Sequence, residues 1–185
     1  MAVHGKATPL AAVAVFCGSN TGHNEAYRQA ADHLGRTLAE RGIELVYGGG
    51  NVGLMGVVAD AALTTGGRVV GVMPRHLVER EVAHRGLSEL KVVADMHERK
   101  AAMAAGADAF IVLPGGPGTM EEFFEAWVWR LLGLHGKPIG LLNTEGYYDR
   151  LDAFLSQVVA EGFMAADARR ALVVESDVDL LLDRL

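Results

Sequence analysis

The sequence contains a single cysteine, Cys17, and no hydrophobic run long enough to cross a membrane. One cysteine excludes an internal disulfide and is typical of a reducing compartment, so we expect the cytoplasm. A membrane span needs ~20 consecutive apolar residues, and no uninterrupted run approaches that length. Positive charge is also scarce, because 17 Lys and Arg face 23 Asp and Glu and give a formal net charge of −6. This balance argues against nucleic acid as the main partner.

Spacings typical of a metal site or a covalent nucleophile are missing as well. His97-Glu98 could begin a zinc helix, but Ala101 stands where the HExxH pattern needs its second histidine. Cys17 has no neighbouring histidine, and we interpret it as a buried packing residue. We therefore expect no metal ion.

Apolar runs of strand length alternate with helical patterns along the chain. The predicted strands are Ala11–Cys17, Ile43–Tyr47, Arg68–Met73, Glu89–Val93, Ala109–Leu113, Pro138–Leu142 and Leu172–Val174. The predicted helices are His23–Arg41, Val52–Thr65, His97–Ala105, Thr119–Leu132, Tyr147–Glu161 and Val178–Leu185. Continuous hydrophobicity predicts strands buried on both faces, so we expect an α/β fold with a doubly wound parallel sheet of about seven strands. Residues 1–9 read as a loose leader and residues 10–185 as a single domain.

The most informative segment is the loop Pro114–Thr119, which lies between a predicted strand and a predicted helix. A loop without Cβ atoms lets backbone N–H groups approach an anion, and the helix dipole adds partial positive charge there. No lysine follows Gly118, so this is not a Walker P-loop. The segment predicts a phosphate site formed by Gly115, Gly116, Gly118 and Thr119.

Two further small-residue loops, Gly18–Asn20 and Gly48–Asn51, follow other predicted strands. Ligands of open α/β sheets bind beyond the carboxyl ends of strands, so we expect all three loops to converge on one cleft. Gly48–Gly53 also matches G-x-G-x-x-G, the dinucleotide fingerprint. However, it follows the second strand, and the ribose-binding acid is missing. Glycines that only permit close packing are the stronger alternative.

Glu122 allows two interpretations. Thr119-x-x-Glu122 matches a capping box, in which the two side chains satisfy the first N–H groups of a helix. The same carboxylate lies about one turn from the predicted phosphate loop, close to where a ribose would sit. Spacing alone favours capping, and both roles stay open at this point.

Arg99 and Lys100 stand at the start of a predicted helix, where the helix dipole disfavours cations. Such an unfavourable placement can mark function, because Arg99 could bind a phosphate or a ribose through two hydrogen bonds. The alternative is a solvated charge cluster with Asp95 or Glu98. The sequence does not decide between them.

Four motifs together resemble the LOG (LONELY GUY) family of cytokinin riboside 5′-monophosphate phosphoribohydrolases. They are Cys17-Gly18-Ser19, Tyr47-Gly48-Gly49-Gly50, Met96-x-x-Arg99-Lys100 and Pro114-Gly115-Gly116-Pro117-Gly118-Thr119-x-x-Glu122. The resemblance extends from about Val13 to Val174. It implies a Rossmann-like fold, a homodimer, an AMP-type ligand under the glycine loop and no cofactor.

By this resemblance, Arg99 and Glu122 are the catalytic pair of a nucleoside 5′-monophosphate N-glycosidase. The reaction releases a free base and ribose 5-phosphate from AMP or an N6-prenylated AMP, and the sequence does not decide between these substrates. The residues implied in phosphate and nucleotide binding are Ser19, Gly49, Arg80, Lys100, Gly115, Gly116, Gly118 and Thr119. Glu81 would lie near the base.

A lysine decarboxylase and a nucleotide-binding carrier are the two alternatives to this function. Family members are often mislabelled lysine decarboxylases, but pyridoxal chemistry needs a Schiff-base lysine with a partner for the ring nitrogen. Of the four lysines, only Lys100 lies near the expected site, beside Arg99. The second alternative is a nucleotide-binding carrier of the molybdenum-cofactor type. Glu122 favours the enzyme, because a pure carrier needs no carboxylate beside an anionic ligand.

Overall fold

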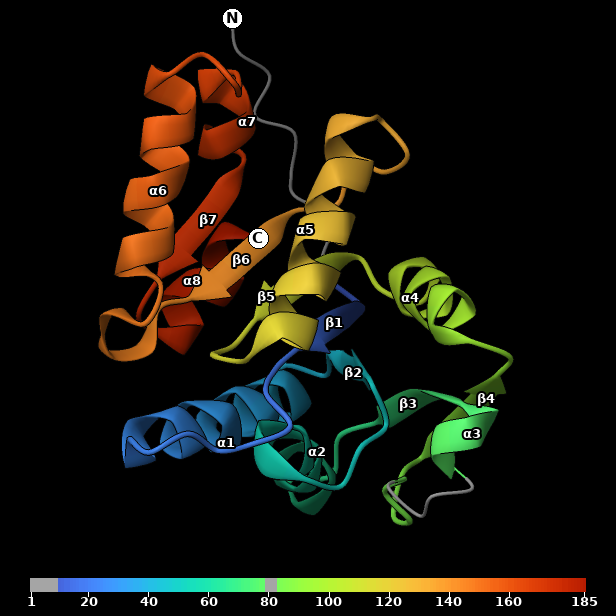
Figure 1. The fold of residues 1–185 in the computed structure, drawn as a ribbon. Coiled ribbons are helices and arrows are strands. Elements are labelled where there is room, and N and C mark those ends of the chain that lie inside the picture. The colour runs from blue at the N-terminus through green and yellow to red at the C-terminus, as the bar shows by residue number, and fades with distance from the viewer. Residues whose placement is uncertain (1–9, 79–82) are drawn as a thin grey trace, which may run out of the picture.

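The structure is a computed structural model that describes residues 10–78 and 83–185. Its seven strands form one parallel sheet in the order β4-β3-β2-β1-β5-β6-β7 (Figure 1). The strands are β1 (Ala12–Phe16), β2 (Glu44–Tyr47), β3 (Val69–Pro74), β4 (Glu89–Val93), β5 (Ala109–Val112), β6 (Ile139–Leu142) and β7 (Leu172–Glu175). The predicted α/β class, the parallel sheet and the number of strands are confirmed. The predicted leader, residues 1–9, lies outside the described residues.

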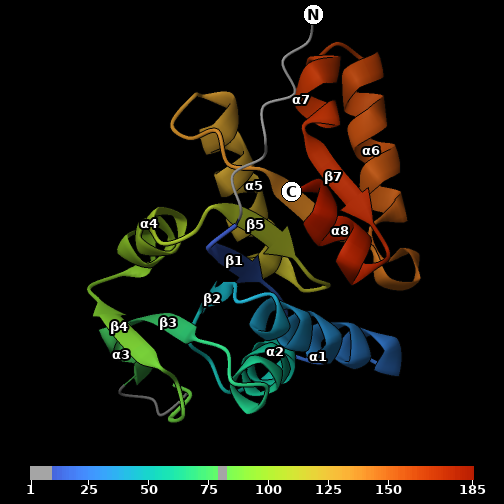
Figure 2. The ribbon, with the colours of Figure 1, turned by 180° about the vertical axis from the view of Figure 1, so that it is seen from behind.

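Helices cover both faces of the sheet (Figures 1 and 2). The helices that pack on one face are α1 (Glu25–Glu40), α2 (Gly53–Thr64) and α8 (Val178–Arg184). Those on the other face are α4 (Met96–Ala105), α5 (Pro117–Leu131) and α6 (Asp149–Ala160). Three short elements are additional to the predicted ones: α3 (Arg75–Val78), η1 (Thr144–Gly146) and α7 (Ala166–Arg170). No helix in the described ranges is both long and apolar enough to cross a bilayer.

The central strand β1 shows why the sheet needs two helical layers. All five of its residues are buried. Val13 and Val15 face the layer of α1, α2 and α8, whereas Ala14 and Phe16 face the layer of α4, α5 and α6. A strand buried on both faces reads as a continuous apolar run, which is the pattern that predicted it.

The order of the strands creates a crevice beside β1. The chain proceeds from β1 outward to β4 on one side, and then continues from β5 outward to β7 on the other. At such a switch point the chain leaves the two central strands toward helices on opposite faces of the sheet, which leaves room for a ligand beyond the strand ends. Gly18, after β1, donates its N–H to the carbonyl of Pro114, after β5, at 3.1 Å. Two of the three predicted loops therefore lie side by side.

The N-terminus of α5 differs from its prediction. The helix begins at Pro117, and Gly116 occupies the N-cap position without any capping side chain. Proline is well suited to the first helical position, because the N–H it lacks would have no partner there. Thr119 is thus the third helical residue, and the capping-box interpretation of Thr119 and Glu122 is wrong.

A side-chain cap is present instead at α4. Asp95 accepts hydrogen bonds from the N–H groups of His97 and Glu98, both at 2.9 Å. The Glu98 carboxylate in turn accepts the N–H of Ala94 at 2.7 Å. These two acids cap the helix, so they are not available to form a charge cluster with the cations that follow them.

Candidate active site

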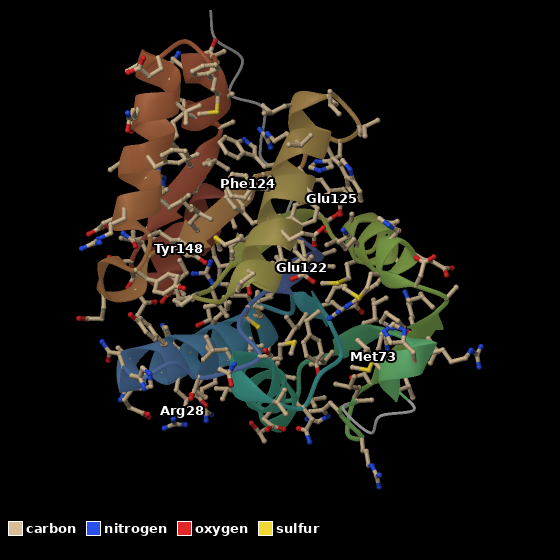
Figure 3. All side chains as sticks on the ribbon, viewed as in Figure 1. Arg28, Met73, Glu122, Phe124, Glu125 and Tyr148 are labelled. Carbon is tan, nitrogen blue, oxygen red and sulfur yellow. The ribbon has the colours of Figure 1, made fainter. Side chains whose placement is uncertain are left out.

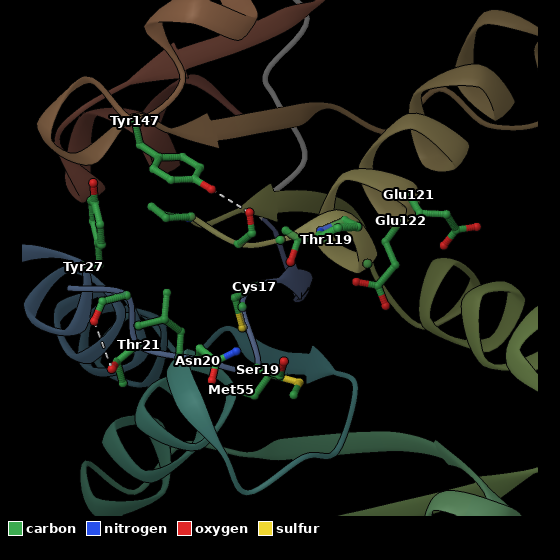
Figure 4. A pocket seen from close by; sticks show the side chains of 18 of the residues that line it. Cys17, Ser19, Asn20, Thr21, Tyr27, Met55, Thr119, Glu121, Glu122 and Tyr147 are labelled. Atoms are coloured by element: carbon green, nitrogen blue, oxygen red, sulfur yellow. Dashed lines mark hydrogen bonds between the residues drawn. The ribbon is translucent and has the colours of Figure 1, made fainter. Parts of the chain in front are cut away.

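A cleft of about 490 Å³ lies at the switch point between β1 and β5. This volume is within the range typical of small-molecule sites. Its walls are the loop after β1 (residues 17–22), the loop and first helical turn after β5 (residues 114–119), and side chains from α2, α4 and α5. Figure 4 shows Glu121 and Glu122 at one end of the cleft and Tyr27 and Tyr147 at the other.

The turn before α5 is open for an anion. Gly118 and Thr119 are the second and third helical residues, whose N–H groups have no acceptor inside the helix. A Cβ atom built on Gly116 or Gly118 would meet no atom within 4 Å, and both glycines line the cleft. The helix dipole adds partial positive charge at the same place. This geometry agrees with the predicted phosphate site.

Gly115 permits close packing between this loop and the loop after β1. A Cβ atom at this position would collide with the Thr119 hydroxyl and would come within 2.9 Å of the Gly18 nitrogen. Gly115 therefore allows the loops after β1 and β5 to approach each other. Thr119 itself is buried and lines the cleft.

Two tyrosines fix the path of this loop. The Tyr147 hydroxyl donates to the carbonyl of Gly115 at 2.6 Å, and the Tyr148 hydroxyl donates to the carbonyl of Leu113 at 2.6 Å. Both follow β6, and sequence reasoning missed them. The signal was present, because residues beyond the carboxyl end of a third parallel strand are expected at the same edge of the sheet.

Arg99 is buried and points into the cleft. Only 9% of the residue is exposed. Its guanidinium donates to the carbonyl of Gly48 at 3.0 Å, and its Nε is buried without a partner among the described residues. A side chain on Gly48 would collide with this guanidinium. The interpretation of Arg99 and Lys100 as a solvated cluster is therefore wrong, because both residues are buried.

Glu122 faces the same cleft from α5, and its carboxylate has no hydrogen bond or ion pair in the described ranges. Burial raises the pKa of its carboxyl from the ordinary value of 4.5 to about 7, although the charge of Arg99 acts in the opposite direction. No ion pair joins these two side chains within the described residues. The carboxyl therefore titrates near neutral pH and faces open space, as an acid–base catalyst requires.

The raised pKa of Glu122 predicts a pH-dependent stability. Ionisation of this carboxyl costs more in the folded chain than in the unfolded chain, so the stability it contributes is complete below pH 4.5 and is lost as the pH rises through about 7. Glu122→Gln removes this loss. We expect the variant to be more stable than the wild type by about 1–3 kcal/mol at pH 8, and by little at pH 4.5. Calorimetric unfolding at both pH values measures the difference, and an equal effect at both would contradict the assignment.

Of the other residues implied in nucleotide binding, Ser19 lines the cleft but Gly49 does not. The carbonyl of Gly49 accepts the N–H of His84 at 2.9 Å, and a Cβ on Gly49 would approach Leu90 and Gly71. Gly49 therefore belongs to the packing between loop and sheet, and its contact with a ligand stays a prediction. Arg80 and Glu81 lie outside the described residues.

Lys100 is also turned away from the cleft. Its ammonium pairs with Glu121 and with Glu125, the latter at 2.9 Å, and it is not among the residues that line the cleft. Its contact with the phosphate stays a prediction, and in this structure Lys100 does not line the cleft. The reason is the packing of α4 on α5, which offers Lys100 two carboxylates.

The remaining glycines of the G-x-G-x-x-G stretch also serve packing. Gly53 has a left-handed φ of +58°, and a Cβ there would collide with the backbone of Ser19 and Asn20. The N–H of Leu54 donates to the carbonyl of Gly18 at 3.0 Å. The stretch thus brings α2 close to the loop after β1, as the packing alternative to dinucleotide binding requires.

Cys17 lies on the floor of the cleft and is buried. Burial raises the pKa of its thiol, and the neighbouring Glu122 carboxylate raises it further. The thiol therefore stays protonated and is no nucleophile. No group of three or more His, Cys, Asp and Glu side chains is placed to hold a metal ion within residues 10–78 and 83–185.

Comparison with known proteins identifies the family. The family described as "Possible lysine decarboxylase" matches residues 55–185. The chain is 51% identical over 173 residues to the probable cytokinin riboside 5′-monophosphate phosphoribohydrolase LOGL1 of Oryza sativa subsp. japonica, covering 94% of this chain and 78% of that protein. The chain belongs to the LOG family. A second LOG relative, LOG1 of Arabidopsis thaliana, is 48% identical over 173 residues and is covered to 81%.

A solved structure outside these curated LOG relatives has the same fold. The molybdenum cofactor binding protein from Rippkaea orientalis aligns with a TM-score of 0.71 at 20% identity, covering 97% of this chain and 96% of that chain. At this identity the likeness concerns the fold alone. The LOG family resemblance predicted from the sequence motifs is confirmed.

Proposed function

We propose that this chain hydrolyses the N-glycosidic bond of N6-modified adenosine 5′-monophosphates and releases the free base and ribose 5-phosphate. The observation that carries the proposal is the cleft itself, in which Glu122 and Arg99 lie beside the open N-terminus of α5. The LOG relatives, named as phosphoribohydrolases of cytokinin riboside 5′-monophosphates, support the same reaction.

Glu122 carries the chemical step of this proposal. As the C1′–N9 bond breaks, positive charge develops on the ribose, and an ionised carboxylate beside the ring stabilises it. Water then forms the C1′–O bond, and its proton passes to Glu122. The departing base leaves with the bonding electrons and takes up a proton. A carboxyl whose pKa is about 7 can both accept and release a proton at neutral pH.

Arg99 and the glycine loop orient the substrate. Arg99 lines the cleft together with Glu122, and its guanidinium supplies hydrogen-bond donors for the ribose hydroxyls. Gly116, Gly118 and Thr119 bind the 5′-phosphate, with Gly115 holding the loop and Ser19 facing it. The phosphate is a remote anchor, whose binding energy serves orientation at C1′.

An assay of products tests the proposal. The chain is incubated with AMP and with N6-isopentenyladenosine 5′-monophosphate, and free base and ribose 5-phosphate are quantified by chromatography. We expect equal amounts of both products, and a much lower rate with the nucleoside that lacks the phosphate. Binding of either nucleotide without release of base would contradict the hydrolase and favour a carrier. The ratio of the two turnover rates identifies the preferred substrate.

We also propose that the chain works as a homodimer in the cytoplasm. A single buried cysteine suits a reducing compartment. The end of α5 and the turn after it expose four apolar side chains, Val128, Leu131, Leu132 and Leu134. Apolar residues gathered on a surface are typical of a subunit contact. Analytical ultracentrifugation tests the dimer, and a monomer at micromolar concentration would contradict it.

A further inference from the structure

Lys100 holds an unusual position beside the catalytic pair. Only 8% of the residue is exposed, and it lies next to Arg99 on α4. Its ammonium pairs with Glu121 and Glu125, which come from α5. Figure 3 shows Glu125 on the side of α5 that faces α4, and Phe124 on the opposite side. The same lysine thus connects the helix that carries Arg99 with the helix that carries Glu122.

The charges around Glu122 explain why such a lysine is needed. Three carboxylates, Glu121, Glu122 and Glu125, stand within one stretch of α5, and the two cations that face them come from α4. Without Lys100, the other two carboxylates would repel the ionised form of Glu122. Lys100 is buried, whereas Glu121 is exposed and Glu125 is partly buried, so the removal of any one of these charges changes the electrostatic potential at the others.

We propose that Lys100 is a positioning residue for the hydrolysis: it fixes α4 against α5 so that Arg99 and Glu122 face the same sugar, and its charge favours the ionised form of Glu122. Lys100 thereby acts through Glu122 and does not bind the phosphate. This inference rests on the proposed function.

The directions of the pKa shifts of Glu122 and Lys100 agree with this arrangement. Burial dominates the raised pKa of Glu122, the charges of Glu121 and Glu125 raise it further, and those of Arg99 and Lys100 lower it. Burial by itself would lower the pKa of Lys100, but the two carboxylates outweigh it and raise that pKa. Cys17, which follows β1, is another titratable neighbour of Glu122 and is uncharged. Lys100 therefore stays charged throughout the range in which Glu122 titrates.

Two variants with opposite charge effects test the inference. Lys100→Met removes a positive charge and Glu125→Gln removes a negative one, and both break the ion pair between Lys100 and Glu125. In the pH profile, kcat/KM falls on the acid side as Glu122 becomes protonated, and we call this fall the acid limb. We expect the acid limb to move to higher pH by about half a unit to one unit in Lys100→Met, and to lower pH by a similar amount in Glu125→Gln. At pH 7, Lys100→Met should lose about two- to fivefold in kcat/KM, with recovery near pH 9, because a carboxyl that is half ionised at its pKa of about 7 becomes roughly one-quarter to one-tenth ionised when the pKa rises by this amount.

The opposite signs separate charge control from a merely structural role. If Lys100 only joined the helices, both variants would weaken activity in the same direction and the acid limb would not move. If Lys100 bound the phosphate, Lys100→Met would weaken ribose 5-phosphate binding strongly and leave the limb in place. Either result would overturn the inference. Lys100→Arg, which keeps the charge, should restore most of the activity.

A spectroscopic readout keeps this test independent of the proposed function. The carboxyl carbon of Glu122 is titrated by NMR in the wild type, Lys100→Met and Glu125→Gln. The midpoint should move up in the first variant and down in the second. These shifts remain measurable if the chain releases no base, in which case the hydrolase fails and the control of Glu122 stands. Equal midpoints in all three proteins would overturn the inference, whatever the activity.

Discussion

Glu122→Gln is expected to lose at least about 10³-fold in kcat while it still folds and binds the nucleotide. Glutamine has the shape of the protonated acid, so the packing of α5 is retained. It carries no negative charge to stabilise the developing cation on the ribose and cannot accept the proton of the attacking water. Base release is followed by chromatography, and the affinity for ribose 5-phosphate by calorimetry.

Glu40→Gln is the matched control for this variant. Glu40 is an exposed acid at the end of α1, so its replacement makes the same change of charge away from the cleft. It should retain the wild-type kcat. Full activity of Glu122→Gln would remove Glu122 from the mechanism. Loss of nucleotide binding together with activity would show that Glu122 binds the substrate and does not catalyse.

Gly118→Ala is expected to weaken binding of the nucleotide about 100-fold without destabilising the fold. Gly118 has a helical position and open space around it, so an alanine there creates no clash and should stabilise the helix by up to ~1 kcal/mol. The new methyl group would project into the cleft, where it would keep a phosphate away from the N–H groups of α5. Titration calorimetry measures the affinity, and thermal unfolding measures the stability.

Two other glycines provide the comparison. A Cβ on Gly136 also meets no atom within 4 Å, but Gly136 lies outside the cleft, so Gly136→Ala should bind the nucleotide normally. At Gly115 a Cβ would collide with Thr119, so Gly115→Ala should lower both stability and affinity. Unchanged affinity in Gly118→Ala would contradict the placement of the phosphate.

Much of the fold could be predicted because its signals are local. Each strand is a continuous apolar run, and the long helices follow a regular pattern, so all seven strands and six helices were found from the sequence. The helices α3 and α7 have only four and five residues, too few to show a period. The start of α5 was misplaced by two residues, because Thr119 and Glu122 imitate a capping box while Pro117 begins the helix.

In the candidate site too, residues in local motifs could be predicted, whereas contacts between distant segments could not. Arg99, Glu122 and the glycine loop lie in compact motifs that sequence reasoning could locate. The environment of Lys100 could not be predicted, because it depends on how α4 packs on α5, and the two acids that pair with Lys100 lie more than twenty residues along the chain. The role of Gly48 was missed for a similar reason. Its missing side chain leaves room for Arg99, which is distant in sequence.

The most direct test of the account is a crystal structure of Glu122→Gln with intact N6-isopentenyladenosine 5′-monophosphate. We predict that the phosphate lies on the N–H groups of Gly118 and Thr119, with C1′ of the ribose between the side chain at position 122 and the guanidinium of Arg99. A sugar bound at the opposite end of the cleft, beside Tyr27 and Tyr147, would contradict it.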